Sequence, residues 1–275
     1  MKQRIVFFGS GYYVIPIVEK LLEHNLLLVV TTEIEGKFIQ YLRNNNIPFL
    51  QSKLKSEEDI KKVMDLNPTI GILASFGAII PKKIIGLFPL GILNIHPSLL
   101  PKYKGPSPIQ FTILNGETSS GTTIIKLDDK VDHGPIVDQQ TTVLDGSETL
   151  QTLTEKLFLL GSHLISKIVQ NIENGLAIEE RQQEEKNESW TKKVFREDGK
   201  IDLNNPPEKE VLKRKIKAFY PWPGVYLTAS LSGNRKIIKL LPEGKIQVEG
   251  KKPMTYKDFT NGYSEGKNII DKLGL

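Results

Sequence analysis

The sequence predicts an α/β protein in which a large domain with a mostly parallel sheet precedes a smaller β-rich module. Continuous apolar runs at residues 5–8, 26–30 and 70–74 are typical of strands buried on both faces of a parallel sheet. Helical patterns at residues 13–23 and 56–66 separate these runs, and such alternation indicates right-handed crossovers. The 275 residues suffice for one large domain and a smaller companion, at roughly 150 residues per domain.

The remaining elements of the first domain follow from the same patterns. We expect a buried strand, a helix and then a strand pair at residues 91–95, 109–114, 122–127 and 136–143. An apolar stripe from Leu150 to Ile172 predicts a long closing helix. Asp145 and Glu148 stand at capping-box spacing before it, and Gly175 predicts its end.

The C-terminal part of the chain has a different character. We expect a first domain over residues 1–180, a polar linker over 181–200 and a second domain over 201–275. Short β-type runs predict strands in the second domain, at residues 225–229, 236–241 and 245–248.

Charge is distributed unevenly between these parts. The net charge of +5 combines −2 over residues 1–180 with +7 over residues 181–275. A basic module of this kind indicates a polyanionic partner such as nucleic acid, although a merely soluble surface is the alternative. The basic run at residues 213–217 fits a nucleic-acid contact or a solvated helix face. The aromatic run at residues 219–223 fits a nucleic-acid contact or an interface between the domains.

Composition excludes several classes of protein and site. The absence of cysteine rules out disulfides, a thiolate nucleophile and Cys-ligated metal, and it favours a reducing, cytoplasmic compartment. The first apolar run meets Gly9 and Gly11 too soon for a secretory core or a membrane span, so we expect a strand and no membrane partner. The turn Gly9–Val14 reads G-x-G-x-x-V, which lacks the third glycine of the dinucleotide fingerprint but can bind an anion.

The densest cluster of unusual residues follows the strand at 91–95. Asn94 and His96 are two residues apart, so their side chains project to the same side of a strand end, where α/β sheets usually bind ligands. An amide donor and an imidazole together can polarise a carbonyl and handle a proton, which acyl transfer requires. A histidine at a strand end can equally be a structural, hydrogen-bonded residue.

A second polar cluster, residues 128–135, contains three aspartates and His133. One of these carboxylates can orient His96 and stabilise its protonated form. The aspartate spacing does not match an EF-hand, so we expect no metal. The chain shows no serine nucleophile elbow and no P-loop, which leaves direct attack by a substrate group.

These segments resemble the signature of the folate-dependent formyltransferases. The resemblance rests on residues 94–110, 114–117, 121–123 and 132–136. Within that superfamily, the C-terminal stretches resemble the subgroup that acts on methionyl-tRNA, at residues 216–224, 250–254, 258–259 and 261–263.

The resemblance implies a Rossmann-like first domain that binds 10-formyltetrahydrofolate and an OB-like second domain. Asn94, His96 and Asp132 match the family's catalytic residues. The residues that match its folate-binding segments are Phe76, Gly77, Ala78, Ile79 and Ile80, then Ser98, Leu99, Leu100 and Pro101, and finally Leu127, Asp128, Asp129 and Val131.

The acceptor and partner that the resemblance implies is initiator methionyl-tRNA. The sequence leaves the oligomeric state open, and we favour a monomer. An enzyme that formylates a nucleotide-linked amino sugar is the alternative, and a non-catalytic folate- or RNA-binding protein is an alternative of another class. Two departures from the family pattern bear on the acceptor. Residues 31–47 replace a long basic insertion and contain only Lys37 and Arg43 as bases, and the second domain is abridged.

Overall fold

The computed structural model describes residues 2–275, which form two compact units. The first unit contains the chain up to Gly105 together with Ser119–Thr142 and Thr154–Trp190. The second unit contains Pro106–Thr118, Val143–Leu153 and Thr191–Leu275. The chain therefore passes between the units several times, and the segment at residues 181–190 belongs to the first unit.

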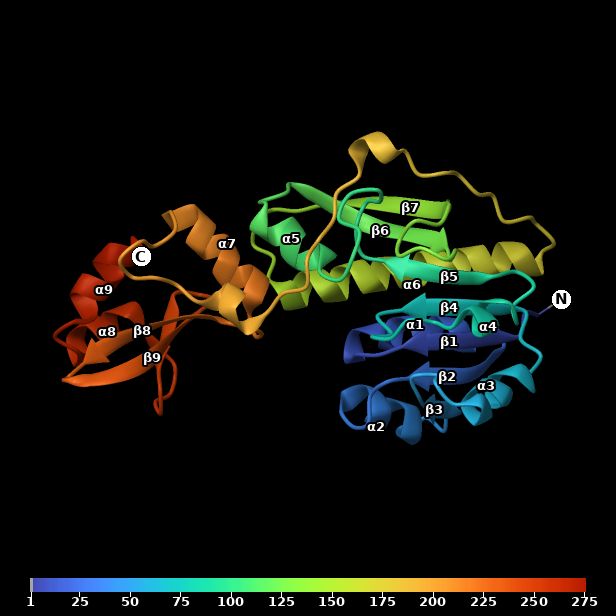
Figure 1. The fold of residues 1–275 in the computed structure, drawn as a ribbon, viewed down its shortest axis with the longest axis horizontal. Helices are drawn as coiled ribbons and strands as arrows, with labels where there is room; N and C mark the ends of the chain where they lie inside the picture. Colours follow the sequence, from blue (N-terminus) through green and yellow to red (C-terminus); the bar gives the residue numbers. More distant parts are fainter. Residues whose placement is uncertain (1) are drawn as a thin grey trace. The chain divides into compact units, whose positions relative to one another are not determined.

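A seven-stranded sheet forms the centre of the first unit, in the order β3-β2-β1-β4-β5-β6-β7 (Figure 1). Strands β1 to β5 pair in parallel and β6 runs antiparallel to β5, so the predicted α/β, Rossmann-like fold class is confirmed. The strands are β1 (Ile5–Gly9), β2 (Leu26–Thr31), β3 (Phe49–Gln51), β4 (Ile70–Ala74), β5 (Ile92–His96), β6 (Ser119–Lys126) and β7 (Ile136–Val143).

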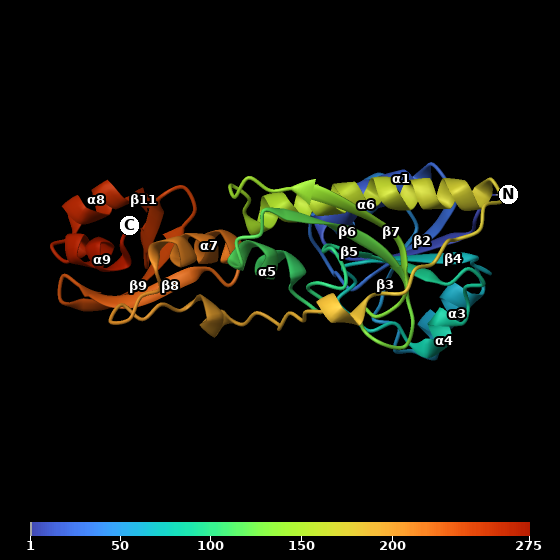
Figure 2. The same cartoon turned by 90° about the horizontal axis from the view of Figure 1, so that it is seen from above.

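Helices cover both faces of this sheet. Figures 1 and 2 show α1 and α6 along one face and α3 and α4 along the other. No helix within residues 2–275 has both the length and the apolar character that crossing a bilayer requires. The helices of the first unit are η1 (Tyr12–Val14), α1 (Ile15–Leu22), α2 (Lys37–Asn44), α3 (Glu57–Met64), α4 (Lys82–Ile85), most of α6 (Leu150–Glu173) and η2 (Glu185–Asn187).

Helix α6 begins later than the capping-box spacing predicts. Glu148 does reach back to the backbone N–H of Asp145, at 3.3 Å, but the helix starts only at Leu150. The cap is instead Thr149, whose hydroxyl accepts from the N–H of Thr152 at 3.3 Å, while the Thr152 hydroxyl accepts from the N–H of Thr149 at 3.0 Å. Two threonines can satisfy backbone N–H groups at the start of a helix as a Ser–Glu pair does. The start of α6 predicted from Asp145 and Glu148 was therefore wrong by one turn.

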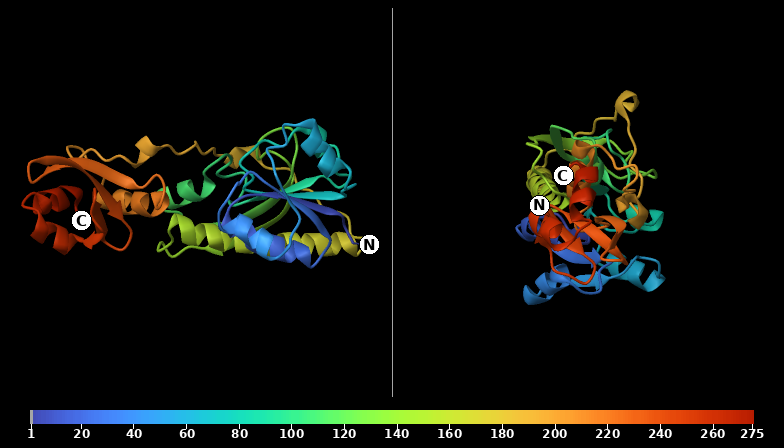
Figure 3. Two further views of the ribbon diagram at one scale, coloured as in Figure 1. Left: turned by 90° about the horizontal axis from the view of Figure 1, so that it is seen from below. Right: turned by 90° about the vertical axis from the view of Figure 1, so that its left-hand side faces the viewer.

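The second unit is built on an antiparallel sheet in the order β11-β10-β9-β8. The three predicted strands correspond to β8, β9 and β10, whereas the two last helices were not predicted; they lie beside the small sheet (red in Figure 3). The elements are α5 (Pro108–Leu114), η3 (Arg196–Gly199), α7 (Lys209–Phe219), β8 (Val225–Leu231), β9 (Asn234–Leu241), β10 (Lys245–Val248), β11 (Met254–Thr255), α8 (Tyr256–Gly262) and α9 (Gly266–Leu273).

Alternation along β1 explains how the first unit buries its core. Val6 and Phe8 point to one face of the strand, where they join a cluster with residues of α3, α4 and the loop after β4. Phe8 packs edge-to-face on Phe76 and Phe88, with ring centroids 5.8 and 5.9 Å apart. This cluster therefore ties the central strand to the loop at Phe76.

We expect Phe8→Ala to destabilise the first unit by about 3–5 kcal/mol, because it removes a fully buried ring and leaves a cavity. Urea unfolding followed by far-UV circular dichroism measures this loss. Ile34→Ala is the matched control, since Ile34 is 80% exposed and its truncation should change stability by less than about 0.5 kcal/mol. Equal stabilities of the two variants would contradict the packing described here.

Candidate active site

Strand β5 places two polar side chains inside the first unit. Asn94 and His96 lie in a strand whose five residues are all buried, and they are 7% and 5% exposed. Because side chains two residues apart in a strand share a face, Asn94 and His96 project to the same side of β5. Buried polar groups require partners, and these come from two loops.

The loop between β6 and β7 brings Asp132 to the same place. Its Oδ1 atom lies 3.4 Å from Nδ2 of Asn94 and 3.5 Å from Nδ1 of His96. Asp132 itself is 9% exposed. The structure thus brings together the three side chains predicted from the sequence, although Asn94 and Asp132 are 38 positions apart in the chain.

Backbone groups fix both ends of this cluster. The N–H of Gly105 donates to Oδ2 of Asp132 at 2.8 Å, and Nε2 of His96 donates to the carbonyl of Tyr103 at 3.0 Å. Since a carbonyl only accepts, Nε2 must carry a hydrogen. Nδ1 then faces the carboxylate, so a second proton on the ring would convert this contact into a charged pair.

Two residues of the cluster adopt a backbone conformation that side chains disfavour. Asp132 has φ +47° and Tyr103 has φ +60°, both in the left-handed region. Such residues persist where surrounding contacts determine the conformation, and they concentrate at functional sites. Here the contacts to Gly105 and His96 depend on these two conformations.

The Asp132 loop is braced at its start as well. Nδ1 of His133 lies 2.5 Å from Oδ2 of Asp128, whose other oxygen accepts from the N–H of Lys130 at 2.9 Å. Partial burial alone would raise the pKa of Asp128, but the hydrogen bonds from His133 and Lys130 outweigh it and hold that pKa below its ordinary value. The brace is therefore present at neutral pH and is lost as the pH falls through the lowered pKa.

Two of the three predicted folate-binding segments meet in the structure. Ala78 and Leu127 pack against the core cluster that contains Phe76 and Ile80, and Nζ of Lys82 lies 3.9 Å from Oδ2 of Asp129. Gly77, with φ +75°, turns the first segment, and Ile79 and Val131 stay exposed, at 88% and 61%. Exposed apolar side chains such as these suit contact with a flat ring.

The third predicted segment faces inward. Ser98 is completely buried, and its hydroxyl donates to the carbonyl of Lys102 at 2.7 Å. Leu100 packs with Ile125 and Ile136, while Leu99 and Pro101 are half-buried. The side chains of Ser98 and Leu100 therefore shape the loop that carries Tyr103, and folate contact by residues 98–101 stays a prediction.

The glycine turn after β1 is already occupied. The N–H of Gly11 donates to Oε1 of Glu33 at 2.7 Å, and the Ser10 hydroxyl lies 3.0 Å from that of Thr32. A carboxylate in this position repels a phosphate, so the turn does not form the anion site that its sequence permits. The helix α2 follows Glu33 within the short segment 31–47.

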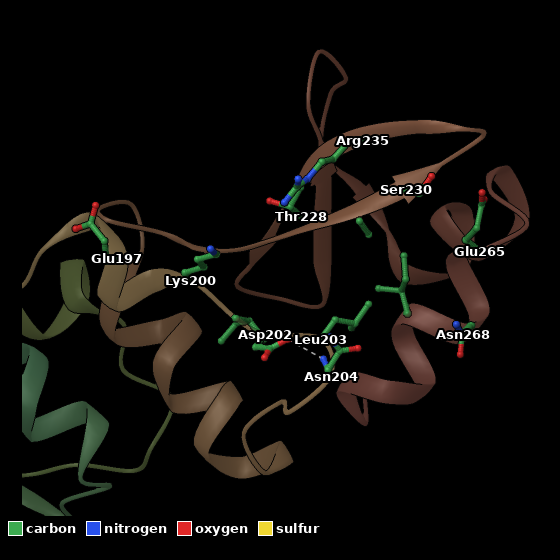
Figure 4. A pocket seen from close by; sticks show the side chains of 13 residues that line it. Glu197, Lys200, Asp202, Leu203, Asn204, Thr228, Ser230, Arg235, Glu265 and Asn268 are labelled. Atoms are coloured by element: carbon green, nitrogen blue, oxygen red, sulfur yellow. Dashed lines mark hydrogen bonds between the residues drawn. The ribbon is translucent and has the colours of Figure 1, made fainter.

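The second unit contains a pocket of its own, shown in Figure 4, with a volume of about 820 Å³. Acidic and basic side chains both line it, among them Glu197, Asp202 and Glu265 together with Lys200 and Arg235. No predicted site residue lies there. Among the side chains that the structure describes, no three of His, Asp or Glu converge in a way that could hold a metal ion.

Sequence reasoning missed the partners of the three side chains. Tyr103 and Gly105 contribute only backbone atoms, which no residue type reveals. The segment 181–190 also escaped notice, because it is polar and has no periodicity, yet Gln183 and Ser189 within it bond to the active-site loops. No signal in the sequence reveals these contacts, because the burial of Lys104, which is 2% exposed, becomes visible only in the structure.

Comparison with known proteins identifies the class of this fold and site. Residues 3–169 match the formyl transferase family. The chain also resembles a 4-N formyltransferase from Francisella tularensis, with a TM-score of 0.71 and 17% identity over 87% of this chain and 97% of that one. At this identity the likeness supports the fold.

Curated relatives narrow the class. The chain is 32% identical to methionyl-tRNA formyltransferase of Thermodesulfovibrio yellowstonii, over 95% of this chain and 96% of that protein. It is 35% identical to the protein of the same name from Chloroflexus aurantiacus, over 81% of this chain and 75% of that one. The chain belongs to the methionyl-tRNA formyltransferase family, whose members are formyl-group transferases.

Gly134→Ala should displace the Asp132 loop, because a Cβ at this glycine would lie 1.8 Å from the carbonyl oxygen of Lys126. We expect formyl transfer to fall by about tenfold or more, since misplacement by about 1 Å can cost up to a hundredfold. The transfer rate and the melting temperature are measured together. Gly86→Ala is the control, because its nearest contact would be an ordinary 3.8 Å; similar rates in both variants would contradict the prediction.

Proposed function

We propose that this protein transfers the formyl group of 10-formyltetrahydrofolate to the free amino group of initiator methionyl-tRNA, in the cytoplasm, for translation initiation. The observation that carries this proposal is the buried contact of Asn94, His96 and Asp132 beside two loops that suit a flat ring. Membership of the methionyl-tRNA formyltransferase family supports the choice of acceptor.

The chemistry that we assign to these residues is direct attack. The neutral amine adds to the formyl carbon, and the resulting tetrahedral adduct carries a negative oxygen that Asn94 and protonated His96 stabilise. Asp132 holds His96 and, through water, relays the amine proton towards N10 of the folate. The bond between the formyl carbon and N10 then breaks, which leaves the formamide and tetrahydrofolate.

The proton arrangement at His96 supports this scheme. Its Nε2–H donates a hydrogen bond to the Tyr103 carbonyl. The oxyanion of the adduct is a stronger acceptor and can replace that carbonyl as the partner of Nε2–H. A proton on Nδ1 would lie towards the Asp132 carboxylate. The His96 ring can thereby stabilise the adduct through Nε2, while the Asp132 carboxylate on the Nδ1 side compensates the positive charge of the ring.

A pocket beside the first folate-binding segment fits the remainder of the co-substrate. It has a volume of about 660 Å³ and is lined by Gly77, Ala78 and Ile79. Lys53 and Lys55 line the same pocket, and their ammonium groups suit the carboxylates of the folate's glutamate. We therefore place the folate along residues 76–80, with its formyl end towards Asn94.

A groove in the second unit suits the tRNA. It has a volume of about 490 Å³ and is lined by Trp222, Tyr226, Arg196 and Lys239, among others. Trp222 is 55% exposed, and the Arg196 guanidinium lies 5.9 Å from the centroid of the Tyr226 ring. Proteins that bind single-stranded nucleic acid combine aromatic rings, on which the bases stack, with basic side chains that neutralise the phosphates. We propose that this groove contacts the tRNA.

Asp132→Asn should lower turnover by about 10²–10³-fold, because it removes the charge that holds and compensates His96. The measurement is formyl transfer from 10-formyltetrahydrofolate to methionyl-tRNA, with circular dichroism to verify folding. Asp65→Asn, at an exposed helix end, is the control and should retain its rate. A folded Asp132→Asn variant with near-normal turnover would sink the assigned role.

The same assay identifies the acceptor. Wild-type protein is offered methionyl-tRNA beside a panel of nucleotide-linked amino sugars, with Asp132→Asn as the blank. Product on methionyl-tRNA alone is expected. Product only on a sugar nucleotide would reassign the acceptor, and no product on either would favour a binding protein without catalysis.

Lys239→Ala should weaken binding of methionyl-tRNA and reduce the slope of log K against log salt by about one, as loss of one phosphate contact predicts. Filter binding at several salt concentrations measures both quantities. Lys267→Ala is the matched control, since it removes one exposed lysine from α9, outside the groove. If both variants change the slope equally, the groove is not the tRNA contact.

A further inference from the structure

The segment 181–190, which we call the strap, bonds to the backbone of both active-site loops. Nε2 of Gln183 donates to the carbonyls of Asp132 and Gly134, at 2.9 and 2.8 Å. The Ser189 hydroxyl accepts from the N–H of Tyr103 at 2.9 Å, and its carbonyl accepts from the N–H of Lys104 at 2.9 Å. One polar segment thus joins the loop that carries Asp132 to the loop that carries Tyr103 and Gly105.

An ion pair between Lys104, which is buried, and Glu188, whose side chain is 29% exposed, reinforces the second of these contacts. Nζ of Lys104 lies 2.9 Å from Oε2 of Glu188 and 5.7 Å from the centroid of the Trp190 ring. A buried ammonium is costly unless it is paired, so Lys104 favours the strap in this position. Hydrogen bonds from Lys104 and Trp190 hold the pKa of Glu188 below its ordinary value, so the Glu188 carboxylate is ionised at neutral pH.

We propose that Gln183 and Ser189, supported by the Lys104–Glu188 pair, are positioning residues for formyl transfer. They touch neither His96 nor the Asp132 carboxylate. They instead bond to the backbone of Asp132 and of Tyr103, whose carbonyl accepts from Nε2 of His96, and to the backbone of Lys104, which directly precedes Gly105. This inference rests on the proposed function for its chemistry, whereas the contacts of the strap stand independently of it.

Strain in the loops explains why they need such support. Tyr103 and Asp132 both have positive φ angles, and the backbone of each is hydrogen-bonded to the strap: the Tyr103 N–H donates to the Ser189 hydroxyl, and the Asp132 carbonyl accepts from Gln183. Without these bonds the loops can relax towards ordinary conformations, and the groups that orient His96 and Asp132 would move with them. Displacement by about 1 Å is enough to slow a reaction by up to a hundredfold.

The test compares Gln183→Met and Ser189→Ala with wild-type protein. We expect kcat to fall by about ten- to a hundredfold while KM for the folate and for methionyl-tRNA changes by less than about twofold. Ser189→Thr keeps the hydroxyl and should restore kcat. Gln51→Met is the matched control, because Nε2 of Gln51 also donates to two loop carbonyls, those of Glu33 and Ile34, and its loss should leave kcat unchanged.

Hydrogen exchange separates this proposal from the proposed function. Amides of residues 102–105 and 132–134 should exchange faster in Gln183→Met and Ser189→Ala than in wild-type protein or Gln51→Met. If wild-type protein fails to formylate methionyl-tRNA, the proposed function falls, and the exchange rates still decide whether the strap holds the loops. If both variants have the exchange rates and the kcat of Gln51→Met, the positioning role of Gln183 and Ser189 is overturned. If Gln183→Met fails to fold, the result for Ser189→Ala alone decides.

Discussion

The buried carboxylate of Asp132 constrains the structure around it. A carboxylate that is 9% exposed is stable only if its oxygens are matched, and here the N–H of Gly105 serves one oxygen while Asn94 and His96 face the other. These partners come from a strand and a loop that must meet at one point. The antiparallel pairing of β5 with β6 brings them together, since the loop after β6 can then return along β5.

The features that follow from burial were predictable from the sequence. Strands β1, β2, β4 and β5 are continuous apolar runs because both faces of the sheet are covered, and that pattern marked them. Asn94 and His96 were detectable as polar residues in such a run. Asp132 could be singled out among its neighbouring aspartates only through the resemblance to a family, because the carboxylate that reaches β5 depends on the path of the loop.

The features that depend on backbone atoms and polar contacts were not predictable. Residues 181–190 have no hydrophobic period, so nothing in the sequence distinguishes a strap from a linker. Helices α8 and α9 are short, seven and eight residues, and therefore give weak periodic signals. The capping box at Thr255 and Asp258 was the available sign of α8.

The division of the chain into units constrains how acceptor specificity can change. The second unit contains residues 106–118 and 143–153 besides the C-terminal residues from Thr191 onward, and the strap that precedes Thr191 belongs to the first unit. A single gene fusion after the region that contains Asn94, His96 and Asp132 would therefore divide the second unit, because residues 106–118 lie before that point in the chain. Exchange by recombination of the second unit, which we propose contacts the tRNA, requires junctions at several places in the gene, so gradual substitution within the existing unit is the simpler evolutionary route to a new acceptor.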